Sequence, residues 1–239
     1  NGSTASDRIG IKLAAQPGDN IRGAGEDIAA GELVLKSGTV LRPGAIGVAA
    51  SLGRSSVRAF RRPIVAIIST GDELLSPSEP HEPGKIYNSN AYSIAAEVKR
   101  YGGVPLMSGI ARDTIESLQE RLTEALKTAD MVVTSAGVSK GDYDVVKDVL
   151  AKNGEIALWS VRMRPAKPLA FGTLDASGDR KVPHLGLPGN PVSAMVAFEQ
   201  FGRPAIHLMM GKTDTAKPTW ANTACWPDDC WTTALPTSR

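Results

Sequence analysis

The stretch "PIVAIISTGDELL", residues 63–75, joins an unbroken apolar run to a polar turn. The β-branched residues between positions 64 and 68 do not alternate with polar ones, which is typical of a strand that is buried on both faces. A glycine and two carboxylates, Asp72 and Glu73, follow at once. Strands buried on both faces occur in parallel sheets covered by helices, so this stretch predicts an α/β fold.

Strand and helix patterns alternate after this run. Apolar runs that indicate further strands are "VPLMSGI", "MVVTS", "IALWSVR", "PLAFGTL" and "VPHLGL". Helical spacing joins Ile94 to Val98, and a clearer amphipathic helix follows Asp113, which forms a capping-box-like start with Glu116. Shorter helices are expected in "VVKDVLAKNG" and in "NPVSAMVAFEQFGRPAIHLMM". The pattern predicts a three-layer α/β fold, with a mostly parallel sheet and helices on both faces.

The chain divides into three regions by composition and hydrophobic periodicity. Residues 1–62 hold many glycine turns, short apolar stretches such as "ELVLK", and a helix-like stretch, "GAIGVAASLG", so we expect a small β-rich and helical connecting region. Residues 63–211 form the expected α/β domain. Residues 212–239 lose all periodicity, and an irregular tail is expected there.

The composition is that of an ordinary globular protein. Of the 239 residues, 42% are hydrophobic and 22% are charged, and the net charge is only +2. This balance indicates no nucleic acid or membrane-surface partner, and no apolar run approaches the roughly 18 residues that span a bilayer. The two cysteines, Cys225 and Cys230, give no disulfide framework, which favours a cytoplasmic location.

Three loops follow predicted strands, where open α/β sheets bind their ligands. They are "STGDELL" at 69–75, "SAGVSKGDYD" at 135–144 and "GLPGNPVSA" at 186–194. Glycine lets the backbone turn and bring N–H groups close to an oxyanion. In the third loop Asn190, Pro191 and Ser193 open a helix, whose N-terminal dipole favours an anion.

Charged residues in and near these loops suggest phosphate together with a divalent cation. The carboxylates Asp72, Glu73, Asp142 and Asp144 would repel an anion unless a cation lay between them. Lys140, Arg164 and Lys167 could pair with the oxyanion itself. Each feature also has a structural explanation, because aspartates beside glycine often form turns and lone cations are usually solvated. Their occurrence together favours a nucleotide or pyrophosphate ligand.

Five ordered motifs carry a resemblance to a known family. In chain order they are "STGDEL", "GKIYNSN", "SAGVSKGDYD", "MRPAKPLAFG" and "GLPGNPVSA". Over about residues 10–211 the chain resembles the molybdopterin molybdenumtransferases of the MoeA and gephyrin C-terminal type. The resemblance implies a molybdopterin-binding, MogA-like α/β domain and an enzyme of molybdenum cofactor synthesis. Such an enzyme inserts molybdenum from molybdate into adenylated molybdopterin and releases AMP, assisted by Mg²⁺.

The resemblance also implies roles for individual residues. Those expected to act in catalysis are Asp72, Glu73, Asp142, Asp144 and Lys167, with Glu73 and Asp144 as metal ligands. Those expected to hold the pterin nucleotide are Gly71, Gly137, Ser139, Lys140, Arg164, Pro188, Gly189, Asn190 and Ser193. Lysine is more usual in the family at the position of Arg164, and glycine is more usual where Ala166 stands.

Other expectations follow from the same resemblance. A homodimer is expected, and the domains that flank the α/β domain in the family are expected to be truncated in this chain. Two alternatives to the transferase remain open: a related pterin adenylyltransferase or nucleotide-cleaving protein, and a non-catalytic pterin-binding fragment.

Overall fold

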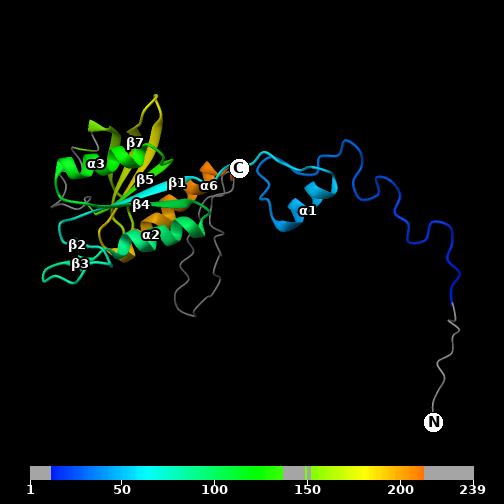
Figure 1. Cartoon of the computed structure of the whole chain (residues 1–239), viewed down its shortest axis with the longest axis horizontal. Coiled ribbons are helices and arrows are strands. Elements are labelled where there is room, and N and C mark those ends of the chain that lie inside the picture. Colours follow the sequence, from blue (N-terminus) through cyan, green and yellow to red (C-terminus); the bar gives the residue numbers. More distant parts are fainter. Residues whose placement is uncertain (1–11, 137–148, 150–151, 213–239) are drawn as a thin grey trace, which may run out of the picture. The chain divides into compact units, whose positions relative to one another are not determined.

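The computed structural model describes residues 12–136, 149 and 152–212 (Figure 1). The chain divides into two units, residues 1–57 and 58–239. None of the helices in the described ranges is both long enough and apolar enough to cross a membrane.

Among the described residues of the first unit, 12–57, one segment is helical: α1 (Pro43–Ser51). Pro43 occupies the first helical position, where its missing N–H costs nothing. The residues described before it, 12–42, form turns and contain no strand, so for these residues the β-rich part of the prediction is wrong. An apolar stretch such as "ELVLK" becomes a strand only when a partner strand accepts its backbone hydrogen bonds, and the described residues of this unit supply none.

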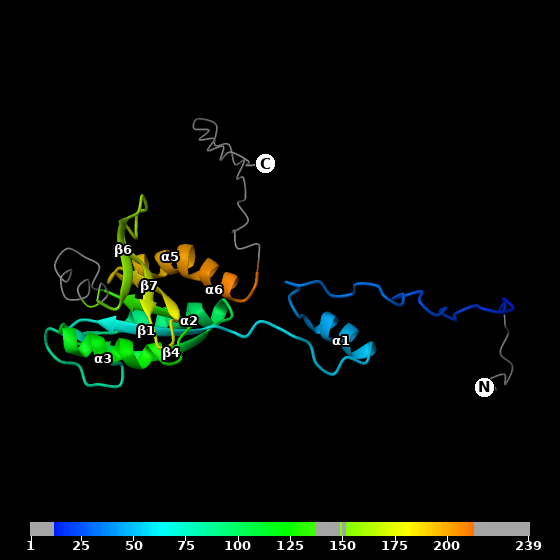
Figure 2. The same ribbon diagram turned by 90° about the horizontal axis from the view of Figure 1, so that it is seen from above.

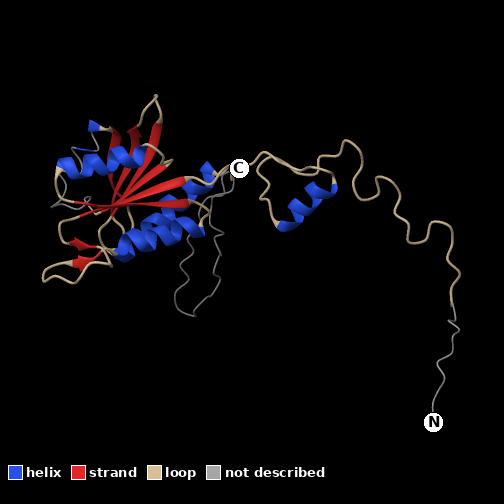
Figure 3. Cartoon of the chain, viewed as in Figure 1, coloured by secondary structure: helices blue, strands red, loops and turns tan. Residues whose placement is uncertain are grey.

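The second unit is built on a six-stranded sheet with the order β4-β1-β5-β8-β7-β6 (Figures 1 and 3). Four neighbouring strands are parallel: β4 (Val104–Ala111), β1 (Ile64–Thr70), β5 (Met131–Ser135) and β8 (Lys181–Leu187). The other two, β7 (Pro168–Asp175) and β6 (Gly154–Ser160), pair antiparallel. The mostly parallel α/β sheet that the sequence predicts is therefore confirmed.

The antiparallel part of the sheet follows from chain length. Only residues 161–167 join β6 to β7, and a parallel connection needs a crossover of a dozen or more residues. The two strands therefore form a hairpin, in which Ser160 pairs with Pro168. A second, two-stranded sheet joins β2 (Leu74–Leu75) to β3 (Ile86–Tyr87).

Helices cover both faces of the large sheet, as Figure 2 shows from above. One face carries α3 (Ile115–Leu126). The other carries α2 (Ser89–Arg100), α5 (Pro191–Ala197), the π-helical turn η1 (Phe198–Gly202) and α6 (Arg203–Met209). The three-layer arrangement is confirmed, while the helix expected in "VVKDVLAKNG" falls largely outside the described residues.

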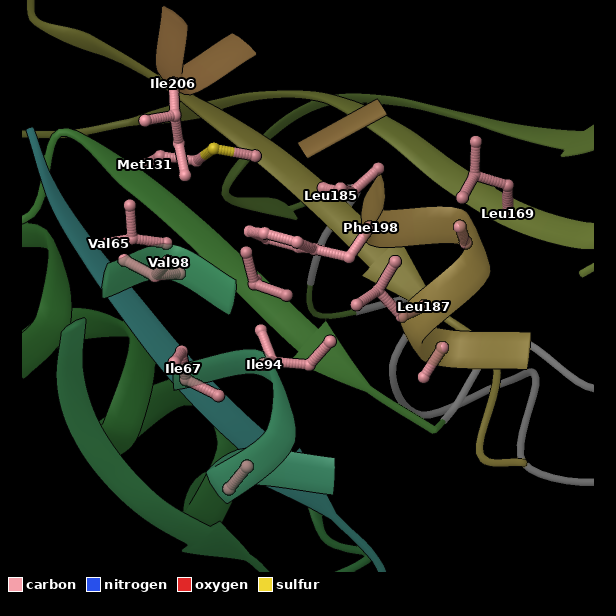
Figure 4. Packing of buried hydrophobic residues seen from close by; sticks show 14 of the residues in the cluster. Val65, Ile67, Ile94, Val98, Met131, Leu169, Leu185, Leu187, Phe198 and Ile206 are labelled. Atoms are coloured by element: carbon pink, nitrogen blue, oxygen red, sulfur yellow. The ribbon is translucent and has the colours of Figure 1, made fainter. Parts of the chain in front are cut away.

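Successive residues of the strands pack into different cores. Val65 and Ile67 of β1 face α2 and η1, whereas Ala66 and Ile68 face α3. All four are at most 1% exposed, which explains the unbroken apolar run in the sequence. Figure 4 shows the first of these cores, with the ring of Phe198 pointing into the cluster.

Candidate functional site at the carboxyl edge of the sheet

The carboxyl ends of β1, β5 and β8 meet at one edge of the sheet, because these strands are parallel neighbours. The chain leaves β1 toward β4 on one side and leaves β5 toward the β6–β8 half on the other side. The strand order therefore reverses between β1 and β5, and ligands of open α/β sheets bind at such a point. The three predicted loops begin at this edge.

A buried polar cluster ties the strand ends to the first turn of α2. The Ser69 hydroxyl lies 3.0 Å from Asn88 Oδ1 and 3.1 Å from the Ser135 hydroxyl. Asn88 Oδ1 also accepts a 3.2 Å bond from the Ala91 N–H, which caps α2. Ser69, Asn88 and Ser135 are all at most 5% exposed, so these bonds form away from water and hold the ends of β1 and β5 to the start of α2.

The first loop places its carboxylates at the surface. The Asp72 N–H donates to Asp113 Oδ2 at 3.1 Å, and the Asp113 N–H donates to Asp72 Oδ1 at 3.4 Å. The Asp72 carbonyl accepts from Lys85 Nζ and, at 3.4 Å, from Arg112 Nη1. Asp113 therefore holds the loop, and the cap of α3 is Thr114, whose Oγ1 accepts from the Ser117 N–H at 3.3 Å. The capping-box start expected at Asp113 is wrong.

Gly71 allows Glu73 to fold back over the loop. Gly71 has φ 144°, and a Cβ at this position would lie 2.3 Å from Glu73 Oε2. A side chain here would therefore both strain the backbone and displace the Glu73 carboxylate. The glycine of "TGDE" thus sets where this carboxylate lies.

The third loop leaves β8 and opens α5. Pro188 is buried, whereas Gly189 and Asn190 are exposed, and Asn190 Oδ1 accepts from the Ser193 N–H at 3.1 Å. The Gly189 carbonyl accepts a 2.8 Å bond from Asn90 Nδ2 of α2. A Cβ on Gly189 would lie 3.4 Å from the Ala136 methyl group, so the loops after β5 and β8 approach closely.

The hairpin between β6 and β7 brings two cations to the same edge. Because β7 runs antiparallel to β8, its first residue lies beside the carboxyl end of β8. Arg164 and Lys167 are exposed and have no ion-pair partner in the part of the chain that the structure describes. Between them Ala166 is 3% exposed with φ 77°, a left-handed conformation that favours glycine.

Carboxylates and cations lie in a row along this edge of the sheet, separated by the ends of the intervening strands. Asp72 and Glu73 follow β1, and the hairpin with Arg164 and Lys167 precedes β7, three strands away. With about 4.8 Å between neighbouring strands, the row spans about 14 Å. Acidic groups at one end and cations at the other suit a ligand that carries phosphate and, with it, a divalent cation.

Part of the predicted site lies outside the described residues: Gly137, Ser139, Lys140, Asp142 and Asp144. Among the residues that are described, no three His, Cys, Asp or Glu side chains are grouped closely enough to hold a metal ion. Asp72 and Glu73 offer oxygen donors of the kind that Mg²⁺ prefers, but alone they do not make a metal site.

The sequence prediction missed four polar residues of this edge: Ser69, Asn88, Asn90 and Ser135. Each is buried, and each hydrogen-bonds across elements that are distant in sequence. The signal was present in the motif "GKIYNSN", whose asparagines precede a helical pattern in the way that capping residues do.

One buried histidine lies below this edge, in β8. Burial alone lowers the pKa of His184 to about 3, and its Nε2 lies 3.1 Å from Thr134 Oγ1 of β5. His184 is therefore neutral at physiological pH and serves the core rather than the site.

The chain matches two family models of known proteins. Residues 66–208, more than half of the chain, match the family model described as a probable molybdopterin binding domain. Residues 3–53 match the model of the MoeA N-terminal region (domain I and II).

Individual relatives agree with the family models. The chain is 38% identical over 218 residues to molybdopterin molybdenumtransferase 2 of Mycobacterium tuberculosis, covering 89% of this chain and 53% of that protein. It is 40% identical over 208 residues to the molybdopterin molybdenumtransferase of a Nostoc species, covering 86% and 47%. The crystal structure of the molybdopterin biosynthesis MoeA protein from Pyrococcus horikosii is similar, with TM-score 0.68 and 32% identity over 79% of this chain and 46% of that one.

The chain thus spans about half the length of the curated relatives it matches. The match at residues 66–208 covers nearly all of the six-stranded sheet. The chain belongs to the family of the probable molybdopterin binding domain.

Proposed function

We propose that this chain is the pterin-binding part of a molybdopterin molybdenumtransferase. The enzyme would take adenylated molybdopterin and molybdate, release AMP and leave molybdenum on the two dithiolene sulfurs of the pterin. The observation that carries the proposal is that the carboxyl ends of β1, β5 and β8, from which the three loops leave, lie at one sheet edge beside the β6–β7 hairpin. The names of the relatives support it.

The reaction brings two anions together, and the edge is suited to that task. Arg164 and Lys167 would hold phosphate or molybdate oxygens, while Gly189 and Asn190 would present backbone N–H groups to the diphosphate. A P–O bond between AMP and the pterin phosphate breaks, and an oxygen of water or molybdate replaces the leaving oxygen on phosphorus. No oxidant or reductant is required. The positive charges of Arg164 and Lys167 would lower the repulsion between the two anions, and because these side chains are in place before the reaction, no free energy is spent on reorganising them.

Mg²⁺ belongs to the proposal as a group that neutralises phosphate charge when it is bound. Glu73 would be one ligand and Asp144, outside the described residues, another. Asp72 would contribute from the same loop, where its second carboxylate oxygen has no hydrogen-bond partner among the described residues.

A homodimer in the cytoplasm completes the proposal. Its support is a set of large apolar side chains that are exposed on two adjoining helices: Tyr92 on α2, and Val192 and Met195 on α5. Exposed apolar groups of this kind mark interaction surfaces. Sedimentation of the chain at micromolar concentration should show a dimer, and a monomer at every concentration would contradict this part.

Activity is tested by incubating the chain with adenylated molybdopterin, Mg²⁺ and molybdate and measuring released AMP. Lys167→Ala should lower the rate at least about tenfold, because an interaction with a phosphate or molybdate charge is lost. The matched control is Lys127→Ala, which removes an exposed lysine paired with Glu124 on α3. AMP release that does not depend on molybdate would favour a nucleotide-cleaving protein, and binding without release would favour a non-catalytic one.

A further inference from the structure

Asn90, the second residue of α2, has a side chain at the proposed site whose role the reaction leaves unexplained. It is only 8% exposed, and its Nδ2 donates a 2.8 Å hydrogen bond to the Gly189 carbonyl. A backbone carbonyl can only accept, so the atom facing it must be the amide nitrogen rather than the oxygen. This bond fixes which way the carboxamide is turned.

The other end of the same carboxamide has no partner. Asn90 Oδ1 is closed off from solvent and accepts no hydrogen bond in the described ranges of the chain. Its neighbours differ, because the side-chain oxygens of Ser69, Asn88 and Ser135 all make hydrogen bonds. A buried acceptor without a donor costs free energy and calls for an explanation.

The position of this acceptor is rigid. Asn88, two residues earlier, fixes the first turn of α2 to the end of β1, and Ser69 joins it to β5. Asn90 in turn holds the loop that follows β8. The unpaired oxygen therefore lies in the seam between the N-terminus of α2 and the loop at Gly189, where the ends of β1, β5 and β8 meet.

We infer that Asn90 is a positioning and specificity residue of this site. Its amide nitrogen holds the Gly189 carbonyl, and its amide oxygen accepts a hydrogen bond from an N–H donor on a ring of the bound ligand. The inference rests on the proposed function, in which the ligand carries two such rings. The adenine amino group and the N–H groups of the pterin are the two sources of that donor.

The test is calorimetric binding to the full chain with Mg²⁺, using AMP, inosine monophosphate and molybdopterin as ligands. Asn90→Ala removes both hydrogen-bonding groups, and Asn90→Leu removes them while keeping the side-chain volume. The control is Asn153→Ala, because Asn153 is a partly buried asparagine that hydrogen-bonds to Gln119 and the Val149 carbonyl, remote from this seam. Melting temperatures of all variants report on folding.

If adenine is the donor, the wild-type chain binds AMP about five- to tenfold more tightly than inosine monophosphate, which lacks the amino group, and the Asn90 variants bind both alike. If the pterin is the donor, the Asn90 variants lose about five- to tenfold in affinity for molybdopterin while AMP and inosine monophosphate remain equal. Either result supports the inference, since a merely structural residue would not alter discrimination between ligands.

Two outcomes overturn it. Asn90 variants that bind all three ligands within about twofold of Asn153→Ala would refute the role of Asn90 and leave the proposed function intact. A wild-type chain that binds none of the ligands would refute the proposed function, and this inference with it.

Discussion

Replacing Gly71 by alanine tests how the first loop is built. Gly71 is buried and has φ 144°, a region that L-residues rarely adopt. The new Cβ would lie 2.3 Å from Glu73 Oε2 and 2.7 Å from its carboxyl carbon. Both contacts are with the end of a flexible side chain, so the Glu73 carboxylate can swing away while the backbone strain remains.

The expected loss of stability comes mainly from the backbone. A residue held in such a region costs about 1–3 kcal/mol. For a unit of this size, about 2 kcal/mol corresponds to a melting temperature lowered by about 4–8 °C. Displacement of Glu73 adds little to this loss, because an exposed carboxylate finds water elsewhere, but it removes a proposed metal ligand.

Calorimetric unfolding of four proteins separates the two effects: wild type, Gly71→Ala, Glu73→Ala and the double variant. The double variant should be about as unstable as Gly71→Ala alone. Gly178→Ala is the matched control, because Gly178 also has a positive φ, 70°, but no atom lies within 4 Å of its added Cβ. A melting temperature of Gly71→Ala within about 1 °C of wild type would refute the strain argument, and a double variant restored to wild-type stability would place the cost in the steric clash.

Four further changes have expected outcomes. Ala166→Gly should raise the melting temperature by up to about 4 °C, because it relieves a left-handed alanine at some cost in unfolded-state entropy; a lower value would contradict this. Phe198→Ala should cost about 3–5 kcal/mol in urea unfolding, since its ring is fully buried, and a loss under about 1 kcal/mol would show that the core repacks. Burial lowers the pKa of His184 to about 3, so as pH falls the unfolded chain binds a proton at a higher pH than the folded chain does. The free energy of unfolding should therefore fall from about pH 6.5 toward pH 3. Urea titrations at several pH values should show a smaller pH dependence for His184→Gln, and an equal dependence in both proteins would contradict the assignment. At Asp130, burial raises the pKa, but hydrogen bonds from Arg61 and from the Ile64 N–H outweigh burial and lower the pKa overall. The resulting stabilisation should be present above the unfolded pKa near 3.8 and lost as pH falls below it. Acid titration of Asp130→Asn should not show this loss of stability.

Local sequence patterns predicted the second unit well. The runs of β1 and β5 are buried on both faces, and that produces the unbroken apolar pattern in the sequence. The run of β4 is partly exposed, and its pattern is correspondingly mixed. The same approach failed for "ELVLK", because a strand also needs a partner, and the local pattern says nothing about whether one exists. The antiparallel pairing of β6 with β7 follows from the short connection between them and not from the residue pattern of either strand.

The site was predictable where it follows a strand. Parallel topology brings the loops after β1 and β8 to one edge whatever their side chains do, so Asp72 and Asn190 fall at the same end of the sheet. Asn88 and Asn90 reach that edge from a helix, and only the three-dimensional crossover places that helix there. Asp113 was misread because a carboxylate near a helix start can cap its own helix or bond to another loop, and spacing does not distinguish the two.

Hydrogen exchange of the full chain, measured with and without adenylated molybdopterin and Mg²⁺, shows where the ligand binds. We expect the pterin diphosphate to bind along the carboxyl edge of the parallel strands. Slower exchange should be confined to peptides that cover residues 69–75, 88–91, 135–144, 161–168 and 186–194. Unchanged exchange in these peptides under saturating ligand, with protection elsewhere in the chain, would contradict it.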